Sequence, residues 1–514
     1  MQHDTRPDAD SSDLIIGVIG CGVMGRGIAQ IAALAGAQVR LHDSRAGAPE
    51  DACTGLLATF GKLVDKGKLD RDKAAAAADR LQACAELDEL RDCHVIVEAI
   101  VEDLDAKKLL FSTLEGIVAP GAILASNTSS LPVTAIAAGL DHPERVVGFH
   151  FFNPVPLMKI VEVIGGLLSA PEMVDYMVAL GRHWGHTAIR AKDTPGFVVN
   201  HAGRGYITEG LRLLAEGVAA VPALDRILRD TAGFRLGPCE LLDLTGLDVS
   251  HPVMESIYHQ YYEEPRFRPQ PLTRQMLTAG LFGKKAGRGF YRYDKDSRQE
   301  PVPEPVPAAQ RPSLVWLSRA RPQLAERIAT LIADAGFALE SGERPSDHAL
   351  CIVTPLGDDA TACCVRENLD ARRTVGIEAL FDLSRRRVVM TTPATEANWC
   401  AMACGLFGAT GIPVSVIRDS AGLVTQRVVA HLINIACDIA QQGIADPLDI
   451  DRAVTLGLGY PLGPLAWGDT IGPHTVLAIL DKLQQHTGDP RYRASPWLQR
   501  RALLGLSLHQ AEIG

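Results

Sequence analysis

Three spaced glycines directly after a short apolar run constrain the fold of this chain more than any other feature. Leu14 to Ile19 has the length of a strand, and a helical pattern runs from Met24 to Ala35. Between them lies Gly20-Cys21-Gly22-Val23-Met24-Gly25. A G-x-G-x-x-G between a strand and a helix is typical of an α/β domain that binds a dinucleotide at the free amides of the helix. A tight turn without a ligand is the alternative interpretation.

Each glycine of this motif has a distinct expected task. Gly20 makes the tight turn, Gly22 lets the backbone approach the pyrophosphate, and Gly25 lets helix and strand pack closely. Val23 and Met24 complete the loop and open the helix, so we expect them to border the cofactor as well.

An acidic residue after the next apolar run indicates which dinucleotide binds. Asp43 follows the run Gln38 to Leu41 and lies 18 residues beyond Gly25. A carboxylate there can bind the ribose hydroxyls of NAD and would repel the additional phosphate of NADP. Arg45 stands two residues later, so the strictness of the choice of NAD stays open.

Further apolar runs of strand length alternate with helical patterns in the first two hundred residues. They are His94–Val97, Ala122–Ala125, Val146–Phe149 and Ile160–Ile164. Such alternation predicts a doubly wound parallel sheet, the Rossmann-type α/β class. From about Asp193 helical periodicity dominates, so we expect an all-α domain to follow.

The helical domain occurs twice. A shift of 226 residues, without a gap, aligns glycines, prolines and aspartates of the two copies. Among the matches are Asp193 with Asp419, Gly196 with Gly422, and Leu236-Gly237-Pro238 with Leu462-Gly463-Pro464. Chance identities would not keep one register over these residue types, so we predict a repeat.

A proline-rich segment separates the two halves. Residues 294–312 contain five prolines and many charges, which predicts a stiff, extended linker. The segment 313–417 has a strand candidate, Leu314–Leu317, and a helix candidate, Pro322–Ala335. Ser318-Arg319-Ala320 stands where a glycine loop would be needed, so we interpret this segment as a degenerate Rossmann-like domain that has lost cofactor binding.

The predicted boundaries follow from these patterns. They are 14–192 for an NAD-binding domain, 193–293 for the first helical domain, 294–312 for the linker, 313–417 for the degenerate domain and 418–514 for the second helical domain.

Composition excludes several classes of function. The net charge is −10 with both signs scattered, and a nucleic-acid binder would usually carry a basic stripe. Apolar runs stay below the roughly 18 residues that span a bilayer. The polar, partly acidic first dozen residues resemble neither a signal nor a transit peptide, so we expect a cytoplasmic protein. The eleven cysteines lack metal-ligand spacing, so we predict no metal site and interpret them as small buried hydrophobes.

A histidine and a glutamate form a candidate catalytic pair. His150-Phe151-Phe152-Asn153-Pro154 follows a strand, and Glu162 lies on the next apolar run, Lys159 to Ile164. The intervening prolines favour a turn that brings this run back beside His150. A neutral imidazole with a carboxylate partner can take the proton of an alcohol while hydride leaves. From these residues alone, a histidine satisfied in the core is at least as plausible.

Several further motifs occur in one order along the chain. They are Val97-Glu98-Ala99-Ile100-Val101-Glu102, Ser126-Asn127-Thr128-Ser129-Ser130-Leu131, HFFNP, Met158-Lys159-Ile160-Val161-Glu162, Lys192-Asp193-Thr194-Pro195-Gly196-Phe197-Val198-Val199-Asn200 and Gly287-Arg288-Gly289-Phe290-Tyr291. Together they resemble the 3-hydroxyacyl-CoA dehydrogenase family over about residues 14–293. The resemblance resumes at 418–514.

The resemblance implies roles for residues of the first half. His150 is implied as general base and Glu162 as its partner. Ser129 is implied as a hydrogen-bonding partner of the substrate, and Asn200 as a residue that holds His150 and the substrate oxygen. Glu102 and Lys107 are implied near the nicotinamide end of NAD. Lys62, Lys66 and Lys68 look like the family's basic helix for CoA phosphates, although a solvated lysine face is equally consistent.

The second half departs from the family pattern. Gln426 takes the position of Asn200, and Val388-Val389-Met390-Thr391-Thr392-Pro393 is the nearest counterpart of HFFNP. We therefore expect one active site per chain. Since relatives with one helical domain generally dimerise through it, the two copies imply an internal pseudo-dimer, with a further homodimer left open.

The implied reaction is NAD-dependent oxidation of an (S)-3-hydroxyacyl-CoA to the 3-ketoacyl-CoA. The duplicated architecture resembles long bacterial members of phenylacetate catabolism that act on 3-hydroxyadipyl-CoA, and a short-chain substrate such as 3-hydroxybutyryl-CoA is also consistent. Neither the acyl length nor recognition of a terminal carboxylate follows from the motifs, and Arg204, Arg212 and Arg235 are candidates for neutralising such a carboxylate.

Three alternative functions are less consistent with these motifs. A β-hydroxyacid dehydrogenase shares a glycine-loop domain and a helical domain, but it typically uses a lysine rather than a pair like His150 and Glu162. A non-catalytic NAD-binding relative would not need Ser129, His150, Glu162 and Asn200 together. A fatty-acid oxidation multienzyme would need a hydratase domain before the glycine loop at Gly20.

Overall fold

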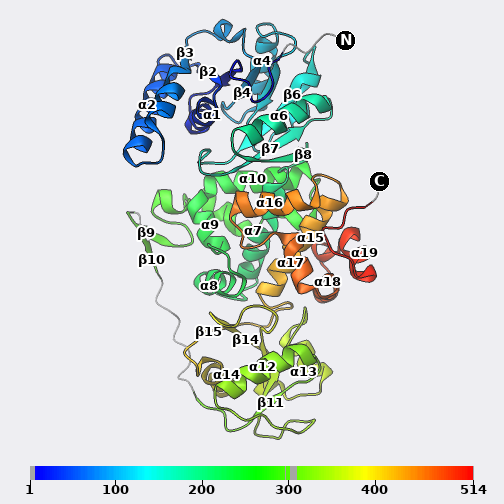
Figure 1. Ribbon diagram of the computed structural model, residues 1–514. Coiled ribbons are helices and arrows are strands. Elements are labelled where there is room, and N and C mark those ends of the chain that lie inside the picture. Colours follow the sequence, from blue (N-terminus) through cyan, green and yellow to red (C-terminus); the bar gives the residue numbers. More distant parts are fainter. Residues whose placement is uncertain (1–5, 296, 301–309, 513–514) are drawn as a thin grey trace. The chain divides into compact units, whose positions relative to one another are not determined.

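The computed structural model describes residues 6–295, 297–300 and 310–512 (Figure 1). The chain forms two compact units. The first comprises residues up to Asn200 together with Gln442–Leu458, and the second comprises His201–Gln441 together with the chain from Gly459 onward. Each unit therefore contains segments from both sequence halves.

The first unit is built on an eight-stranded sheet. Its strand order is β3 (Leu81–Cys84), β2 (Gln38–His42), β1 (Ile15–Ile19), β4 (Val95–Glu98), β5 (Ile123–Ser126), β6 (Val146–Phe151), β7 (Ile160–Gly165) and β8 (Thr187–Lys192). The six neighbouring strands from β3 to β6 in this order are parallel, which confirms the Rossmann-type prediction for β1, β2, β4, β5 and β6. The prediction of a wholly parallel sheet is wrong, because β7 runs antiparallel to β6 after a short turn that replaces a helical crossover. Strands β3 and β8 were not predicted.

Helices pack on the sheet of the first unit. They are α1 (Val23–Leu34), α2 (Ala48–Asp65), α3 (Arg71–Asp79), α4 (Leu104–Glu115), α5 (Val133–Ala137), α6 (Pro171–His183) and α16 (Pro447–Leu458). The core under α1 and α6 consists of buried side chains such as Ile28, Val39, Phe149 and Val163. Helix α16 contacts β7 and β8 although it belongs to the second helical repeat.

The predicted helical repeat is confirmed. The first copy has α7 (Val199–Ala215), α8 (Val221–Ala232), α9 (Pro238–Thr245), α10 (Leu247–Gln260) and α11 (Pro271–Thr278). The second has α15 (Thr425–Gln441), α16, α17 (Pro464–Ile471), α18 (Pro473–Thr487) and α19 (Pro496–Leu504). A shift of 226 residues superposes the bounds of α7 on α15, α8 on α16 and α9 on α17. Short 3-10 helices span Leu87–Leu90, Pro143–Arg145, Pro265–Phe267, Lys284–Ala286, Ala371–Arg373 and Pro490–Tyr492.

The second sheet is a truncated copy of the first. Its order is β11 (Val315–Leu317), β12 (Leu350–Val353), β13 (Thr374–Ile377), β14 (Arg387–Thr391) and β15 (Val414–Ile417), with helices α12 (Pro322–Asp334), α13 (Ala360–Arg366) and α14 (Ala397–Gly408). Successive strands pair parallel, parallel, antiparallel and parallel, which is the sequence of pairings from β4 to β8.

This correspondence corrects the interpretation that Ser318-Arg319-Ala320 stands at the position of a glycine loop. Strand β11 matches β4, and the described residues contain no counterpart of β1 to β3 in this sheet. A conserved cap supports the match: Asp193 accepts hydrogen bonds from the amides of Val133 and Thr134 at the start of α5. Asp419 does the same for Ala360 and Thr361 at the start of α13. The glycine-loop half of the domain is missing, not altered.

The start of the predicted linker is structured. Strands β9 (Arg292–Asp294) and β10 (Ser297–Gln299) pair antiparallel, and residues 301–309 of the linker lie outside the described residues. Within the described part of the chain, no helix is long and apolar enough to cross a membrane. All eleven cysteines are free thiols.

Candidate active site

The glycine loop joins β1 to α1 as the sequence predicts. Gly20 has φ of +98°, which an L side chain rarely adopts, and a Cβ there would collide with the carbonyl of Ala99. A Cβ at Gly25 would collide with the carbonyl of Gly20. At Gly22, by contrast, a Cβ would meet no atom within 4 Å. The fold itself therefore requires Gly20 and Gly25, whereas Gly22 leaves open space where a phosphate can approach the first amides of α1.

A pocket of about 540 Å³ opens beside this loop. Gly20, Gly22, Asp43, Arg45 and residues 99–101 contribute to its lining. Val23 is 62% exposed at the first turn of α1, and the neighbouring Met24 is half-buried. The glycine cradle and the acid at the end of β2 fit a dinucleotide, with the pyrophosphate at the loop and a ribose at the carboxylate.

Asp43 is held as an anion. Its carboxylate accepts hydrogen bonds from the Cys21 amide at 2.8 Å and from the backbone and guanidinium of Arg45. The Arg45 side chain, helped by the Cys21 amide and opposed by partial burial, lowers the pKa of Asp43 to about 2. Arg45 lies mostly in solvent, so it can move from this carboxylate when a ribose binds.

A buried chain of polar contacts joins β4, α4 and the loop after β5. Lys107 donates to Glu98 at 2.6 Å, and its Nζ lies 3.4 Å from Glu102. The Ser126 hydroxyl donates to the other oxygen of Glu98, also at 2.6 Å. Burial alone would raise the pKa of Glu102, but Lys107 and hydrogen bonds from the serine loop lower it. The predicted pair Glu102 and Lys107 therefore shares one network.

Ser129 belongs to the same network. Its amide donates to Glu102 at 2.8 Å and its hydroxyl is 3.3 Å from the same oxygen. The preceding Asn127 accepts a hydrogen bond from the Phe151 amide, directly after His150. Glu102 thus ties the serine loop to α4, while Asn127 ties it to β6.

Sequence reasoning missed two residues here, Glu98 and Asn127. Glu98 is fully buried at the end of β4, where it anchors Lys107. The signal was available, since a glutamate that directly follows the apolar run Val95–Val97 at a strand end is unusual without a partner.

His150 and Glu162 are cross-strand neighbours. The antiparallel pairing of β6 with β7 sets them opposite each other, and His150 Nδ1 lies 2.7 Å from Glu162 Oε2. Their side chains are 6% and 0% exposed. The remaining oxygen of Glu162 accepts the amides of Val198 and Val199, each at 2.9 Å. A buried carboxylate thereby orients one ring nitrogen and is itself fixed by two backbone donors.

Asn200 follows these two amides as the second residue of α7. Glu162 therefore links His150 to the start of α7. The asparagine itself is half-buried. Among the described residues no hydrogen bond joins the Asn200 side chain to His150, so the role predicted for Asn200 stays a prediction.

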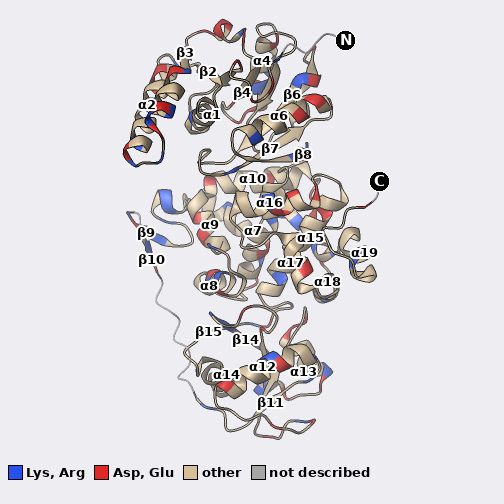
Figure 2. Cartoon of the chain, viewed as in Figure 1, with Lys and Arg blue, Asp and Glu red and all other residues tan. Residues whose placement is uncertain are grey.

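The three candidate CoA lysines lie in and after the last turn of α2 and are exposed. Figure 2 shows acidic and basic residues together on this helix. Lys68 lines a cavity of about 400 Å³ together with Gln30, Pro156 and Lys159. Lys62 and Lys66 do not contribute to it, so the structure separates Lys68 from the other two.

Comparisons with known proteins match both the sheet domain and the helical domains of the chain. The family model for the NAD binding domain of 3-hydroxyacyl-CoA dehydrogenase matches residues 15–194. The model for the C-terminal domain of the same family matches twice, at 196–293 and 422–510.

Individual relatives show the same pattern. The chain is 37% identical over 497 residues to 3-hydroxyadipyl-CoA dehydrogenase of Escherichia coli, covering 95% of this chain and 97% of the relative. It is 41% identical over 278 residues to a probable 3-hydroxybutyryl-CoA dehydrogenase of Bacillus subtilis, covering 54% of this chain and 96% of the relative. A crystal structure described as 3-hydroxybutyryl-CoA dehydrogenase from Escherichia coli aligns with a TM-score of 0.83 at 35% identity, covering 96% and 98% of the two chains.

Proposed function

Because this chain belongs to the 3-hydroxyacyl-CoA dehydrogenase family, we propose that His150 and Glu162 carry out the oxidation of its substrate's 3-hydroxyl group. The observation that carries this proposal is the buried 2.7 Å contact between the two side chains. Since Nδ1 faces Glu162, Nε2 is the nitrogen that accepts the hydroxyl proton. Glu162 keeps the ring oriented and stabilises the imidazolium that forms.

The glycine loop and Asp43 hold the cofactor in this proposal. Gly20, Gly22 and Gly25, with Val23 and Met24, border the pyrophosphate, and Asp43 accepts the ribose hydroxyls. Glu102 and Lys107 lie toward the nicotinamide end. NAD, when bound, supplies the acceptor for the hydride that leaves C3.

Ser129 and Asn200 position the substrate oxygen. The Ser129 amide makes the shorter contact to Glu102, at 2.8 Å, and the hydroxyl donates to the same oxygen only at 3.3 Å, so the hydroxyl turns from Glu102 to the substrate oxygen in this proposal. Asn200 directly follows the two residues whose amides hold Glu162, so its backbone is fixed relative to the catalytic pair. Lys68 binds a CoA phosphate, and Lys62 and Lys66 add an exposed positive field.

One active site per chain is the further part of this proposal. Gln426, at the position of Asn200, is fully buried and binds the Gly357 amide, the Pro355 carbonyl and Glu378. Its amide group is therefore occupied by the protein itself. The two helical copies form a pseudo-dimer in which the second copy has a structural task.

The proposed substrates are 3-hydroxyadipyl-CoA and short-chain 3-hydroxyacyl-CoA thioesters such as 3-hydroxybutyryl-CoA. The curated Escherichia coli sequence and the Escherichia coli crystal structure carry one of these names each, at nearly equal identity to this chain. Both substrates present the same reacting carbon, so the proposed chemistry is common to them.

The test is NADH consumption with acetoacetyl-CoA and 3-ketoadipyl-CoA side by side. We expect wild-type protein to reduce at least one, and His150→Ala to lose roughly two to four orders of magnitude in turnover. His142→Ala is a matched control, because His142 is half-exposed and its ring contacts Glu144 alone. Near-normal turnover of His150→Ala would refute the assignment. Absence of any turnover in wild-type protein that still binds NADH would favour a non-catalytic relative.

A further inference from the structure

The oxygens of Asp43, the acid expected to hold a ribose, are already occupied by donors of the protein itself. Oδ1 accepts hydrogen bonds from the amide and the Nε of Arg45, each at 3.0 Å. Oδ2 accepts from the Cys21 amide at 2.8 Å and from Nη2 of Arg45 at 3.2 Å. A carboxylate has about four lone-pair sites, so these donors use its capacity. A ribose hydroxyl that donates to Asp43 therefore competes with the Arg45 guanidinium.

The Arg45 guanidinium is the donor that can leave. Its side chain is 71% exposed, whereas that of Asp43 is 9% exposed. An exposed ion pair contributes only about 1.5- to fivefold to an equilibrium constant, because water solvates and screens the charges. Lys107 shows the opposite arrangement in the same unit, since it is 1% exposed and lies between Glu98 and Glu102. Arg45 is thus held at Asp43 by a contact that a ligand can replace.

The same pair determines the charge of the cofactor pocket. Of the described residues that line the cavity of about 540 Å³, Asp43 and Arg45 are the ones with charged side chains. His42 also lines it, but this ring is 8% exposed and its Nδ1 lies 3.1 Å from the Cys84 carbonyl oxygen. An unpaired aspartate would repel a phosphate, whereas a guanidinium cancels that charge and binds phosphate itself. Ser44, exposed between the two, adds a hydroxyl to this end of the pocket.

The two dinucleotides differ in what they return to Arg45. When Asp43 accepts the hydroxyls of an unphosphorylated ribose, Arg45 loses its ion pair and gains no other anion. When the ribose carries a 2′-phosphate, the guanidinium exchanges one anion for another and can form two parallel hydrogen bonds. The competition for Asp43 therefore favours NADP over NAD, in opposition to the negative charge of Asp43 itself.

We propose that Arg45 determines cofactor selection in this protein, holding Asp43 in the free protein and binding the 2′-phosphate of NADP(H) in the complex. The protein then accepts NADP(H) in addition to NAD(H), and the pair of Arg45 and Asp43 sets the ratio of the two affinities. This assignment rests on the proposed function, since it takes Asp43 as the residue that binds the ribose.

The test is a fluorescence titration of the full chain with NADH and with NADPH, which needs neither acyl-CoA nor turnover. We expect wild-type protein to bind NADPH within about thirtyfold of NADH, since the guanidinium offsets the repulsion by Asp43. In Arg45→Met the Kd for NADPH should rise roughly tenfold, the lower part of the range for losing a hydrogen bond to a charged group. The Kd for NADH should fall about 1.5- to fivefold, because Asp43 no longer has to release a partner. The ratio of the two Kd values should therefore widen about 15- to 50-fold.

Arg190→Met is the matched control. Arg190 is a 51% exposed arginine that pairs with Asp175, and it lies on β8 at the far edge of the sheet from β2. Its replacement should leave the ratio of the two Kd values unchanged. An equal change of both Kd values in Arg45→Met would overturn the proposal, as would wild-type protein that binds NADPH more than about thirtyfold more weakly than NADH.

A double-mutant cycle separates a direct phosphate contact from an effect through Asp43. Asp43→Asn should narrow the ratio of the Kd for NADPH to that for NADH about tenfold, because NADH loses a charge-assisted hydrogen bond and NADPH loses a repulsion. Adding Arg45→Met to Asp43→Asn should still raise the Kd for NADPH roughly tenfold. If Arg45→Met has no effect in this background, Arg45 acts only through Asp43 and the phosphate contact is refuted.

Cofactor selection and the reaction can fail separately. If the wild-type protein reduces neither 3-ketoacyl-CoA while Arg45→Met widens the ratio of the two Kd values, the proposed function fails and the selection by Arg45 stands. If turnover with NADH proceeds while wild type and Arg45→Met show the same ratio, the selection by Arg45 fails and the proposed function stands.

Discussion

At the scale of single residues, Glu162 has two separate tasks because its two oxygens face different partners. Oε2 meets His150, and Oε1 receives the amides of Val198 and Val199. The same carboxylate therefore orients the base and fixes the start of α7. An amide in its place keeps the shape but changes the hydrogen-bonding character of one side.

Glu162→Gln should lower turnover by roughly two to four orders of magnitude, since the imidazolium loses its compensating charge. NAD affinity should stay within about threefold of wild type, because Glu162 lies away from the glycine loop. Steady-state kinetics and an NADH fluorescence titration would measure the two quantities. A large loss of NADH affinity with intact turnover would show that Glu162 supports the fold and not the reaction.

Asp43 gives a second prediction at this scale. Because Arg45 lowers the pKa of Asp43 to about 2, the carboxylate is ionised throughout the working range of pH. Asp43→Asn should therefore weaken NADH binding about tenfold, at every pH from 6 to 9, through loss of one charge-assisted hydrogen bond to the ribose. The matched variant Asp13→Asn alters an exposed acid before β1 and should have no effect. Unchanged NADH affinity in Asp43→Asn would show that Asp43 does not bind the ribose.

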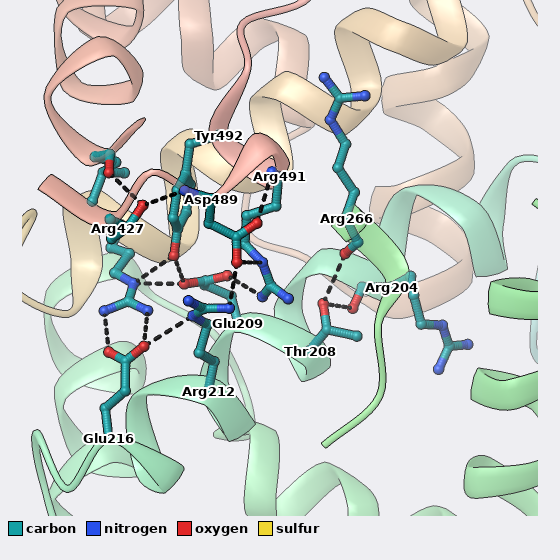
Figure 3. A network of polar contacts seen from close by, with 12 residues as sticks. Arg204, Thr208, Glu209, Arg212, Glu216, Arg266, Arg427, Asp489, Arg491 and Tyr492 are labelled. Carbon is teal, nitrogen blue, oxygen red and sulfur yellow. Dashed lines mark hydrogen bonds and ion pairs between the residues drawn. The ribbon is translucent and has the colours of Figure 1, made fainter. Parts of the chain in front are cut away.

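At the scale of elements, α7 and α15 pack through polar groups that water does not reach. Gly205 of α7 lies against His431 and Ile435 of α15. Beside them, Glu209 accepts from Arg427, Arg491 and Tyr492 (Figure 3). Burial lowers the pKa of His431 to about 4, with Glu209 opposing the shift. His431 is thus neutral in the folded protein.

This packing predicts a loss of stability in acid. The unfolded chain protonates His431 near its ordinary pKa of about 6.5, before the folded protein does, so stability falls as pH drops from about 6.5 toward 4. The two pKa values correspond to about 2 kcal/mol lost between pH 7 and pH 5. Urea unfolding at these two pH values should show a smaller difference for His431→Leu than for wild type. An equal difference in both proteins would mean that His431 does not titrate on unfolding.

At the scale of the whole molecule, the two sequence halves exchange a helix. α16 of the second repeat packs on β7 and β8 of the first sheet. Its counterpart α8 binds the second sheet domain, where Asp230 pairs with Arg386 and the Thr231 carbonyl accepts the Asp382 amide. Each helical copy therefore packs against the sheet domain of the other half.

A charge in α16 should consequently damage the unit that holds the glycine loop. Ile450 is fully buried on this helix, and Ile450→Asp should destabilise the first unit by about 2–5 kcal/mol. Leu448→Asp is the control on the same helix, since Leu448 is 53% exposed. Hydrogen exchange of β7 and β8 amides reports the effect locally. Unchanged protection of these strands in Ile450→Asp would contradict the exchange of helices.

The sequence predicted what short segments encode and missed what distant segments build. The glycine loop, Asp43, His150 and Glu162 each belong to a local motif whose chemistry can be recognised without a fold. The burial of Glu98, the antiparallel direction of β7 and the absence of counterparts of β1 to β3 depend on pairing across the sheet. The docking of α16 on the first sheet depends on contacts between residues that are more than 250 positions apart, which no local pattern records.

The exchange of α16 also determines when the first unit can finish folding during protein synthesis. The sheet of the first unit is covered by α16 only after residue 458 has been synthesised, although its last strand ends at Lys192. At bacterial and eukaryotic elongation rates, the ribosome needs on the order of 10–50 s for that interval. During this time the face formed by β7 and β8 is uncovered on the nascent chain. A chaperone that binds the nascent chain would protect this face until α16 has been synthesised, whereas a pause in translation before residue 458 would prolong its exposure.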